Sequence, residues 1–217
     1  MRWRAGGKLV NQLDLPRKVE RRAEILGAAE RCFVRSGFHQ TSMQEICVEA
    51  GMSPGNLYRY FPSKEALIAG IAERDRANVA QDFAGADLTQ GLFTALERLA
   101  HHYFTVRPIE QVMLCTEVMA EARRNSAIAR IEESFNADVR KWLTAMFAAA
   151  VERGDLSDGA DIEGAVDMLM IIADGVWWRR ALDPHFKPET LIPVFLDVAR
   201  HLLRDRASLQ HNRPGER

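Results

Sequence analysis

Apolar residues recur along the chain at spacings of three and four, which is typical of helices that bury one face. No stretch alternates apolar and polar residues for long, so strands are not indicated. We therefore predict an all-α fold with short helices in the first third of the chain and longer helices after it. The predicted helices span about residues 17–35, 42–50, 54–60, 64–83, 88–106, 109–124, 126–153, 162–182 and 188–206.

Several of these helix ends carry capping residues. Gly37 follows the first helix and supplies a residue that adopts the left-handed conformation easily. Ser42 and Glu45 have the spacing of a capping box, and Ser53 precedes Pro54 as the N-cap of the next helix. The two ends of the chain lack a periodic apolar face. We predict a flexible arm over residues 1–16 and a flexible tail over residues 207–217.

The net charge of −1 conceals an uneven distribution of charge along the 217 residues. Residues 1–64 carry 11 basic and 6 acidic side chains, whereas residues 65–217 carry 18 basic and 24 acidic ones. A basic segment attracts a polyanion and an acidic segment repels it. We therefore expect any phosphate-binding surface to lie in the N-terminal part of the chain.

The reactive residue types argue against most enzyme classes. Cys32, Cys47 and Cys115 form no CxxC pair, so neither a disulfide framework nor a zinc cluster is expected, and a reducing cytoplasm fits. The neighbours His101 and His102 point about 100° apart on a helix, unlike the i, i+4 pair of a metal site. No GxGxxG motif, P-loop or nucleophile constellation is present. We expect no enzyme activity, no cofactor, no metal site and, since the apolar stretches are short, no membrane span.

Residues 41–64 carry the most informative pattern, two short capped helices joined by a turn. Gly51 permits the sharp bend in this turn. The apolar residues spaced to close a small core beneath it are Ile46, Ala50, Met52 and Leu57. The second helix, 54–60, carries polar and aromatic side chains that suit a DNA groove. The pattern predicts a helix-turn-helix that binds double-stranded DNA.

Residues 46–67, ICVEAGMSPGNLYRYFPSKEAL, resemble the signature of TetR-type transcriptional regulators. The shared features are the turn glycine, the Leu-Tyr-x-x-Phe end of the recognition helix and the Ser-Lys-Glu-x-Leu start of the next helix. The resemblance extends upstream through Phe33 and Gly37 and covers about residues 20–75. Cys47 departs from the alanine usual at its position, which is a small change at a buried site.

The resemblance implies a set of DNA contacts. Thr41 would donate to a phosphate, Tyr58 and Lys64 would hold the DNA backbone, and Arg59 and Tyr60 would reach bases or phosphates. A phosphate would also explain why Lys64 starts a helix, where its charge opposes the helix dipole. For the two tyrosines the alternative is core packing. The predicted DNA-binding residues are Thr41, Ser42, Ser53, Pro54, Gly55, Asn56, Tyr58, Arg59, Tyr60 and Lys64.

The resemblance further implies a second domain that dimerises and encloses a ligand pocket. The helices predicted at 162–182 and 188–206 are apolar over more than one face, so each needs a second partner. We predict that this partner is another subunit; the alternative is a fully internal helix. The predicted dimer-interface residues are Met168, Ile172, Val176, Leu191, Phe195, Val198 and Leu202.

Aromatic and thioether side chains on the central helices suit an adaptable apolar ligand site, with ordinary core packing as the alternative. Two acidic pairs, Glu117 with Glu121 and Asp167 with Asp174, would either neutralise a cationic ligand or form solvated helix faces. The predicted pocket residues are Phe93, Tyr103, Phe104, Met113, Glu117, Met119, Trp142, Met146, Met170, Asp174, Trp177 and Trp178.

Together these observations predict a cytoplasmic, homodimeric repressor on a palindromic DNA operator. Residues 17–63 would form the DNA-binding domain and residues 64–206 the helical regulatory, ligand-binding and dimerisation domain. A small amphipathic or aromatic effector would release the DNA, with efflux as the favoured controlled process. The alternatives are a similar regulator without a small-molecule ligand and a helical-bundle enzyme or adaptor.

Overall fold

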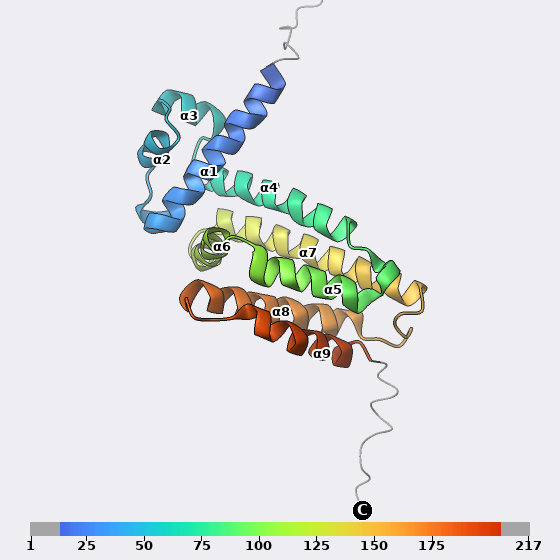
Figure 1. The fold of residues 1–217 in the computed structure, drawn as a ribbon. Coiled ribbons are helices and arrows are strands. Elements are labelled where there is room, and N and C mark those ends of the chain that lie inside the picture. The colour runs from blue at the N-terminus through green and yellow to red at the C-terminus, as the bar shows by residue number, and fades with distance from the viewer. Residues whose placement is uncertain (1–13, 205–217) are drawn as a thin grey trace, which may run out of the picture. The chain divides into compact units, whose positions relative to one another are not determined.

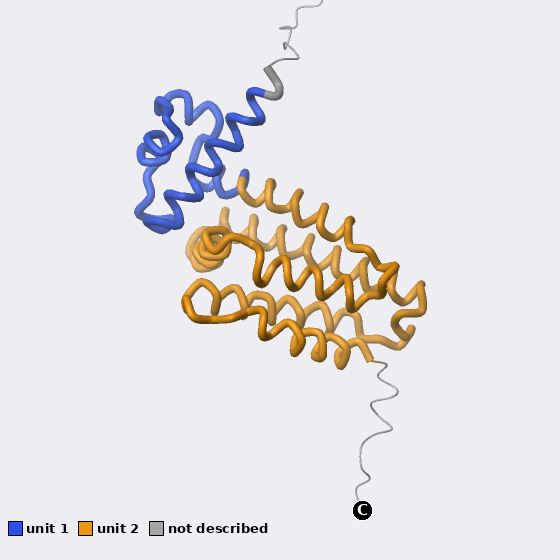
Figure 2. Tube along the Cα trace, in the orientation of Figure 1, with its two compact units in different colours: residues 1–70 blue, residues 71–217 orange. Residues whose placement is uncertain are grey.

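The computed structural model describes residues 14–204, with side chains from residue 17 onward, and all its secondary-structure elements are helical (Figure 1). The α-helices in this range are α1 (Asp14–Gln40), α2 (Met43–Glu49), α3 (Pro54–Tyr60), α4 (Lys64–Ala84), α5 (Leu92–His101), α6 (Ile109–Ala122), α7 (Ser126–Glu152), α8 (Ile162–Leu182) and α9 (Ile192–Leu202). The predicted all-α fold is confirmed. The chain divides after Gly70 into unit 1, residues 1–70, and unit 2, residues 71–217 (Figure 2). The division falls within α4, whereas the sequence placed a domain boundary before it.

Unit 1 has a core to which α1, α2 and α3 all contribute. Ile25 and Phe33, which the sequence placed on one stripe of α1, are fully buried. They share this burial with Ile46 of α2 and Leu57 of α3, both predicted to lie beneath the turn. The small core of the helix-turn-helix is therefore present, and it holds α2 and α3 on α1.

The first two turns of α4 also belong to unit 1, and Gly70 allows them to pack closely. A Cβ atom at Gly70 would lie 2.9 Å from the ring of Phe61 and 3.0 Å from the side chain of Leu26. Real Cβ contacts are essentially never as short as the first of these, so only glycine fits without displacing a neighbour.

Helix α1 is longer than predicted at both ends. It begins at Asp14, so residues 14–16 of the predicted arm are helical, and residues 1–13 lie outside the described part of the chain. Gly37 adopts φ 73° and kinks the helix where the sequence predicted its end. Helical structure then resumes for the three residues up to Gln40.

The helix-turn-helix forms over the predicted residues. Ser42 N donates to the carboxylate of Glu45 over 2.7 Å, and Glu45 N donates to Ser42 Oγ over 3.1 Å, which is the predicted capping box. Gly51 adopts φ 60° in the turn. Ser53 is the N-cap of α3, as predicted, although its side chain makes no capping hydrogen bond. The Ser53 carbonyl instead accepts from Asn56 N and closes the first turn.

The helix predicted at 88–106 is interrupted twice. Gly91, at φ 90°, separates a 3-10 turn, Leu88–Gln90, from α5. After His101 the backbone widens into a π-helical segment, His102–Val106. This segment is held by α8, because Trp177 Nε1 donates to Tyr103 O over 3.2 Å and Arg180 donates to Thr105 O over 3.2 Å.

The helix predicted at 188–206 is likewise divided into a 3-10 turn, Pro188–Leu191, and α9. Pro193 lies in the first turn of α9, where its missing N–H needs no partner. Residues 205–217, which include the end of this predicted helix and the predicted tail, lie outside the described residues.

The core of unit 2 is built by α5, α7, α8 and α9 together with the π-helical segment. The rings of Phe104 and Phe195 meet edge to face at its centre, 5.2 Å apart. Helices α8 and α9 lie side by side at one edge of the unit (Figure 1). Among residues 14–204, none of the helices combines the length and apolar character that a bilayer crossing requires.

Candidate nucleic-acid interface and effector cavity

The outer face of α3 carries most of the predicted DNA-binding residues. Leu57 points into the core and is fully buried, whereas Tyr58 is 50% exposed and Arg59 is exposed. Core packing is therefore not the role of Tyr58, while Tyr60 is half-buried. Most other members of the predicted set are exposed or half-buried, namely Ser42, Ser53, Pro54, Gly55 and Asn56. The recognition helix thus presents an aromatic and a cationic side chain to solvent.

Thr41 has a structural role instead of the predicted phosphate contact. It is 1% exposed, and its hydroxyl lies 2.8 Å from Gly37 O and 3.0 Å from Cys32 O, carbonyls of α1. The hydroxyl proton is used inside unit 1, so it is not presented to a DNA backbone. Thr41 closes the kink of α1 and sets the start of α2.

Lys64 also has partners within unit 1. Its ammonium donates to Phe38 O and, over 3.2 Å, to His39 O, and it lies 4.5 Å from the centre of the Phe38 ring. The position of this lysine at the start of a helix therefore has a structural reason besides the phosphate contact that the sequence predicts. Lys64 stabilises the carbonyl groups that the kink of α1 leaves without helical partners.

Among the described residues of unit 1, few cations are both exposed and without an internal partner. Glu49 pairs with Arg31 over 2.7 Å and with Arg35 over 3.4 Å, and these hydrogen bonds lower the pKa of its carboxyl. Arg59, by contrast, makes no hydrogen bond or ion pair with any described residue. The same holds for Arg17 and Lys18 at the start of α1, which the sequence analysis did not select. In the sequence, the excess of basic residues in the N-terminal part of the chain was the feature that indicated Arg17 and Lys18.

A cavity of about 140 Å³ lies within unit 2. All of α4 to α9 contribute to its wall, which is mostly apolar and aromatic. Six of the predicted pocket residues line it, namely Tyr103, Phe104, Met119, Met170, Asp174 and Trp177. The lining residues that the sequence analysis did not select include Val79, Phe83, Arg107, Cys115, Glu132, Phe135 and Asn136. Phe195, predicted for the dimer interface, lines the cavity as well.

The other six predicted pocket residues do not line this cavity. Met146 is packed in the core, and Trp142 stacks on the outside of the wall against Phe83, with ring centres 6.0 Å apart. Phe93 lies beneath the guanidinium of Arg200. The remaining three lie nearer to solvent, and these are Met113, Glu117 and Trp178.

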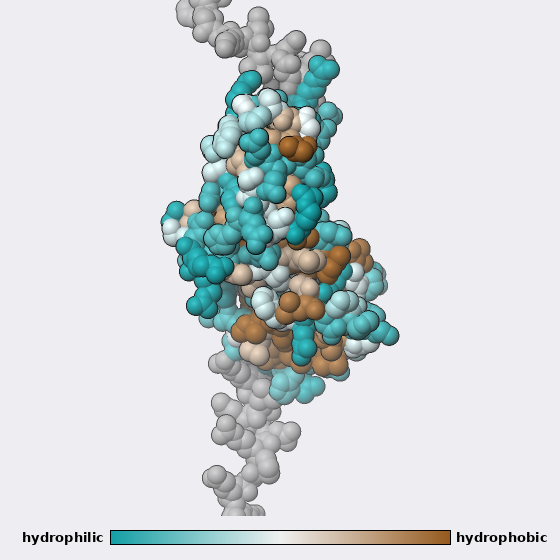
Figure 3. Space-filling view, turned by 90° about the vertical axis from the view of Figure 1, so that its left-hand side faces the viewer, coloured by the Kyte–Doolittle hydropathy of each residue, from teal (hydrophilic) through white to brown (hydrophobic). Residues whose placement is uncertain are grey.

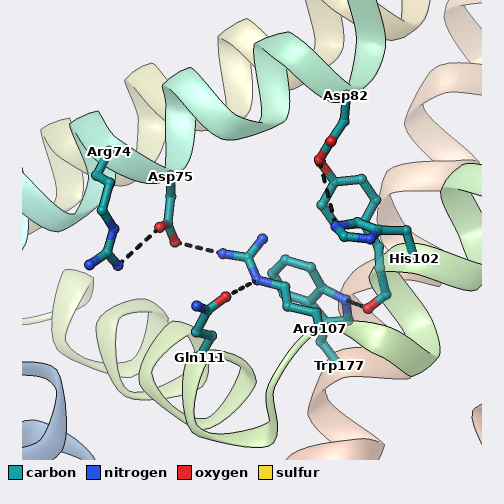
Figure 4. A network of polar contacts seen from close by, with 8 residues as sticks. Arg74, Asp75, Asp82, His102, Arg107, Gln111 and Trp177 are labelled. Carbon is teal, nitrogen blue, oxygen red and sulfur yellow. Dashed lines mark hydrogen bonds and ion pairs between the residues drawn. The ribbon is translucent and has the colours of Figure 1, made fainter. Parts of the chain in front are cut away.

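Arg107 connects the cavity wall to α4 (Figure 4). Its guanidinium donates to Asp75 of α4 over 2.6 Å and to Gln111 of α6 over 3.0 Å. It also lies over the ring of Trp177, 5.1 Å from the ring centre. Arg107 is only 8% exposed, so the ion pair is poorly screened by water. No sequence motif marked this arginine.

A second connection to α4 is made by Tyr103. Its hydroxyl donates to Asp82 over 2.7 Å, and His102 lies 3.6 Å from the same carboxylate (Figure 4). Burial, reinforced by the charge of Asp82, raises the pKa of Tyr103 well above its usual value. Tyr103 therefore stays protonated and acts as a donor. Arg107 and Tyr103 thus bind α4 at two points, Asp75 and Asp82, which lie two helical turns apart.

Glu132, Asn136 and Asp174 form the polar end of the cavity. Asn136 donates to Glu132 over 3.3 Å, and Asn136 and Asp174 are exposed, so the cavity reaches solvent here. Burial raises the pKa of Glu132 and of Asp174, and the charge of Asp174 raises that of Glu132 further. Burial also raises the pKa of the neighbouring Cys115 thiol to about 12.

An exposed apolar stripe runs along α8. Val176 and Phe195, two of the predicted dimer residues, are instead buried within the chain, 4% and 8% exposed. Their apolar character serves the core of unit 2. The large apolar residues that α8 and the start of α9 leave exposed are Met168, Ile171, Trp178, Leu182, Leu191 and Val194. Figure 3 shows hydrophobic residues gathered on one face of unit 2. Of the other predicted dimer residues, Ile172, Val198 and Leu202 are half-buried.

Comparison with known proteins assigns both units. The sequence pattern described as "Bacterial regulatory proteins, tetR family" matches residues 25–71, and that described as "BetI-type transcriptional repressor, C-terminal" matches residues 95–204. The chain belongs to the TetR family. The tetR-family pattern ends one residue after the end of unit 1, and the BetI-type pattern lies within unit 2.

Individual TetR regulators resemble the chain over most of its length. The regulator UidR of Escherichia coli K12 is 30% identical over 159 residues, 71% of this chain and 79% of UidR. The repressor KstR of Mycolicibacterium smegmatis is 29% identical over 174 residues, 79% of this chain and 80% of KstR. The structure of Salmonella enterica GusR superposes with a TM-score of 0.76 at 31% identity and covers 91% of this chain and 99% of GusR.

Membership of the TetR family confirms the resemblance predicted from residues 46–67. TetR proteins are DNA-binding transcriptional regulators and not enzymes, so the helical-bundle enzyme is ruled out as an alternative. The second match identifies residues 95–204 of unit 2 as a BetI-type C-terminal domain.

Proposed function

We propose that this TetR repressor binds a palindromic operator as a homodimer and leaves it when a small amphipathic or aromatic compound enters the cavity of unit 2. The observation that carries the proposal is the course of α4. Val79 and Phe83 of α4 line the cavity, while Lys64, at the other end of the same helix, bonds to the backbone of α1. One continuous helix therefore contacts the effector cavity and the helix-turn-helix unit.

The attachments of α4 to the cavity wall support a release mechanism. Arg107 and Tyr103 line the cavity and hold Asp75 and Asp82 of α4. A compound that displaces either side chain changes the position that α4 prefers. Because α4 runs without a break to Lys64, the change is carried to the start of the helix in unit 1.

Release of DNA requires that the compound binds the two conformations of the protein with different affinities; binding alone is not enough. A compound shifts the equilibrium only if it binds the DNA-free conformation more tightly than the DNA-bound one. To weaken DNA binding by about 100-fold, this difference must reach about 2.7 kcal/mol. An ion pair that is 2.6 Å long and nearly inaccessible to water can supply a coupling of this size when it is broken.

Homodimerisation is supported by the exposed apolar stripe of α8. A palindromic operator presents two half-sites about 34–36 Å apart, so two copies of α3 must be held at a fixed separation. The stripe, which includes Met168, Ile171 and Trp178, offers a surface that a second copy would remove from water.

The aromatic and thioether wall of the cavity supports efflux of amphipathic compounds as the controlled process. DNA as the partner supports action in the cytoplasm. A regulator of the same fold without a small-molecule effector is the second candidate, because the cavity is small compared with drug-sized sites.

The experiment starts from operator DNA selected from a random pool, with binding measured by fluorescence anisotropy. Phenethylamine, 2-phenylethanol and phenylacetate are then titrated while DNA release and tryptophan emission are recorded together. We expect one of these aromatic probes to quench emission and release DNA over the same concentration range. Trp177→Phe is expected to lose most of the quenching. Quenching without release would favour the effector-independent regulator.

Asp75→Asn tests the transmission step. The variant keeps a hydrogen-bond acceptor for Arg107 but loses the charge of the ion pair. We expect it to bind DNA and the probe while the coupling between them falls by about tenfold. Asp167→Asn, which weakens an ion pair between α7 and α8 outside the cavity lining and away from α4, serves as the matched control and is expected to retain full coupling.

A further inference from the structure

Two carboxyl groups in the cavity take no part in holding α4. Glu132 of α7 and Asp174 of α8 line the wall, yet neither forms an ion pair with a described residue. The hydrogen bond from Asn136 is the one polar contact of Glu132 in the part of the chain that the structure describes. Asp174 has no such contact there. Both groups thus face a largely apolar space without a counter-charge.

The one cation of the lining does not neutralise them. Arg107 pairs with Asp75 over 2.6 Å and donates its Nε–H to Gln111, so its charge is already balanced outside the cavity. The Cys115 thiol also lines the wall, without a hydrogen bond to any described residue, and its high pKa keeps it neutral. The balance of charge in the lining is therefore negative.

Such a pair is unfavourable in the empty cavity. An ionised carboxylate loses its hydration in apolar surroundings, and two neighbouring carboxylates repel each other. Burial raises the pKa of both groups, and the charge of Asp174 raises that of Glu132 further. A positive charge placed near both groups would offset these costs.

We propose that the cavity recognises a small organic cation, an amine with one apolar ring whose ammonium group pairs with Glu132 and Asp174. This inference rests on the proposed function, because it names the class of effector. The ring would pack on aromatic side chains of the wall, among them Phe83, Phe135 and Trp177. Aromatic faces attract cations as well, which adds to the preference.

The size of the cavity and the chemistry of its lining together favour a small aromatic amine as the ligand. The cavity of about 140 Å³ is close to the volume that holds one benzene ring, so a single ring with a short aliphatic amine fits. A metal ion requires oxygen ligands on several sides, whereas the described residues offer no group of three or more acidic, cysteine or histidine side chains for one. An apolar wall with acidic groups at one end matches an amphipathic cation.

The test measures binding to the free protein by isothermal titration calorimetry. Phenethylamine, 2-phenylethanol and phenylacetate share a ring and differ in charge, which is positive, neutral and negative. We expect the amine to bind at least about tenfold more tightly than the alcohol and the acid to bind most weakly. Equal binding of the three, tighter binding of the acid, or no binding of the amine at about 1 mM overturns the proposal.

Single variants assign the preference to the two carboxyl groups. Glu132→Gln and Asp174→Asn are each expected to weaken phenethylamine binding by about fivefold or more and to leave 2-phenylethanol within about twofold. The matched controls are Glu133→Gln on the exposed face of α7 and Asp167→Asn, whose ion pair with Arg140 lies outside the cavity lining. Circular dichroism checks the fold of each variant. If both cavity variants keep the wild-type selectivity, the proposal fails.

Failure of this inference and failure of the proposed function give different results. If the amine binds selectively but leaves the operator complex intact, the cation site stands and the release mechanism fails. If the alcohol or the acid releases DNA as well as the amine does, the release mechanism stands and the cation site fails.

Discussion

Lys64 and Arg59 lie within one segment of unit 1 and differ in whether their charge already has a partner. The Lys64 ammonium donates to two carbonyls of α1, whereas Arg59 of α3 makes no hydrogen bond or ion pair with a described residue. Sequence reasoning treated both as DNA contacts, because a motif gives the position of a charge but not its local partners. The structure separates their expected roles.

We expect Lys64→Met to lower the thermal midpoint by several degrees, because two carbonyls of α1 lose a charged donor. The salt dependence of DNA binding should stay unchanged. Arg59→Met should have the opposite profile, with an unchanged midpoint and a salt slope smaller by about one ion. Differential scanning fluorimetry and anisotropy titrations at several salt concentrations measure both quantities. A reduced slope in Lys64→Met at unchanged stability would restore Lys64 as a phosphate contact.

The cavity carboxyl groups make a further prediction about stability. The folded-state pKa of Glu132 and of Asp174 is raised, so the contribution of these two groups to folding stability is largest below their ordinary values of 4.5 and 3.8 and is lost as the pH rises through the raised values. The groups that act on Glu132 are Asn136, whose hydrogen bond lowers its pKa, and Asp174, whose charge raises it, while the neighbouring Cys115 has a pKa too high to titrate in this range.

Glu132→Gln and Asp174→Asn should therefore raise the thermal midpoint of the free protein at pH 7 while they weaken amine binding. The gain over wild type should shrink as the pH is lowered towards 4. Thermal melts of both variants across this range measure the effect. Variants less stable than wild type at pH 7 would show that the carboxylates are stabilised by groups other than those named here.

At the scale of the elements, the spans of α3 and α8 were predicted correctly because their signals are local. Pro54 starts α3 and Asp183-Pro184 follows α8, so residue type alone defines these ends. The π-helical segment 102–106 could not be found in this way. It depends on donors from Trp177 and Arg180, more than 70 positions along the chain.

The same distinction applies to the cavity. The aromatic residues Tyr103 and Trp177 were recognised by type, since rings on central helices favour an apolar site. Arg107 was missed because its role depends on Asp75, 32 positions earlier. Val176 and Phe195 were misassigned because apolar periodicity shows that a face is buried, but not whether the chain itself or another molecule covers it.

Gly70 provides a test of how α4 is seated in unit 1. Gly70→Ala places a Cβ atom 2.9 Å from Phe61, so we expect unfolding to become easier by about 1–3 kcal/mol despite the higher helix propensity of alanine. Gly27→Ala in α1 is the matched control, because its Cβ meets only the end of Arg31 at 3.6 Å. The control should be neutral or more stable in urea titrations. Equal stability of the two variants would contradict the close packing of α4.

At the scale of the whole molecule, the proposed homodimer requires self-association through the exposed stripe of α8. Ile171→Glu introduces a charge into the exposed stripe of α8, where the side chain is 62% exposed. We expect the fold to remain and the dissociation constant of the dimer to increase by more than about tenfold, because the new carboxylate would be buried against the partner subunit. Sedimentation equilibrium measures the effect.

Val48→Glu is the control for this prediction, because Val48 is 78% exposed on α2, in the other unit. It should leave the association constant unchanged. A wild-type protein that sediments as a monomer at micromolar concentration would exclude the proposed homodimer.

The attachments of α4 at Asp75 and Asp82 have a mechanical consequence. Asp82 and Asp75 are seven residues apart and Lys64 lies eleven residues beyond Asp75, so at about 1.5 Å per residue the two intervals along α4 are about 10 Å and about 16 Å. If Asp82 acts as the fulcrum, a shift of about 1 Å at Asp75 becomes about 2.5 Å at Lys64. In the proposed mechanism, a small displacement of α4 at Asp75 would therefore be enlarged at Lys64.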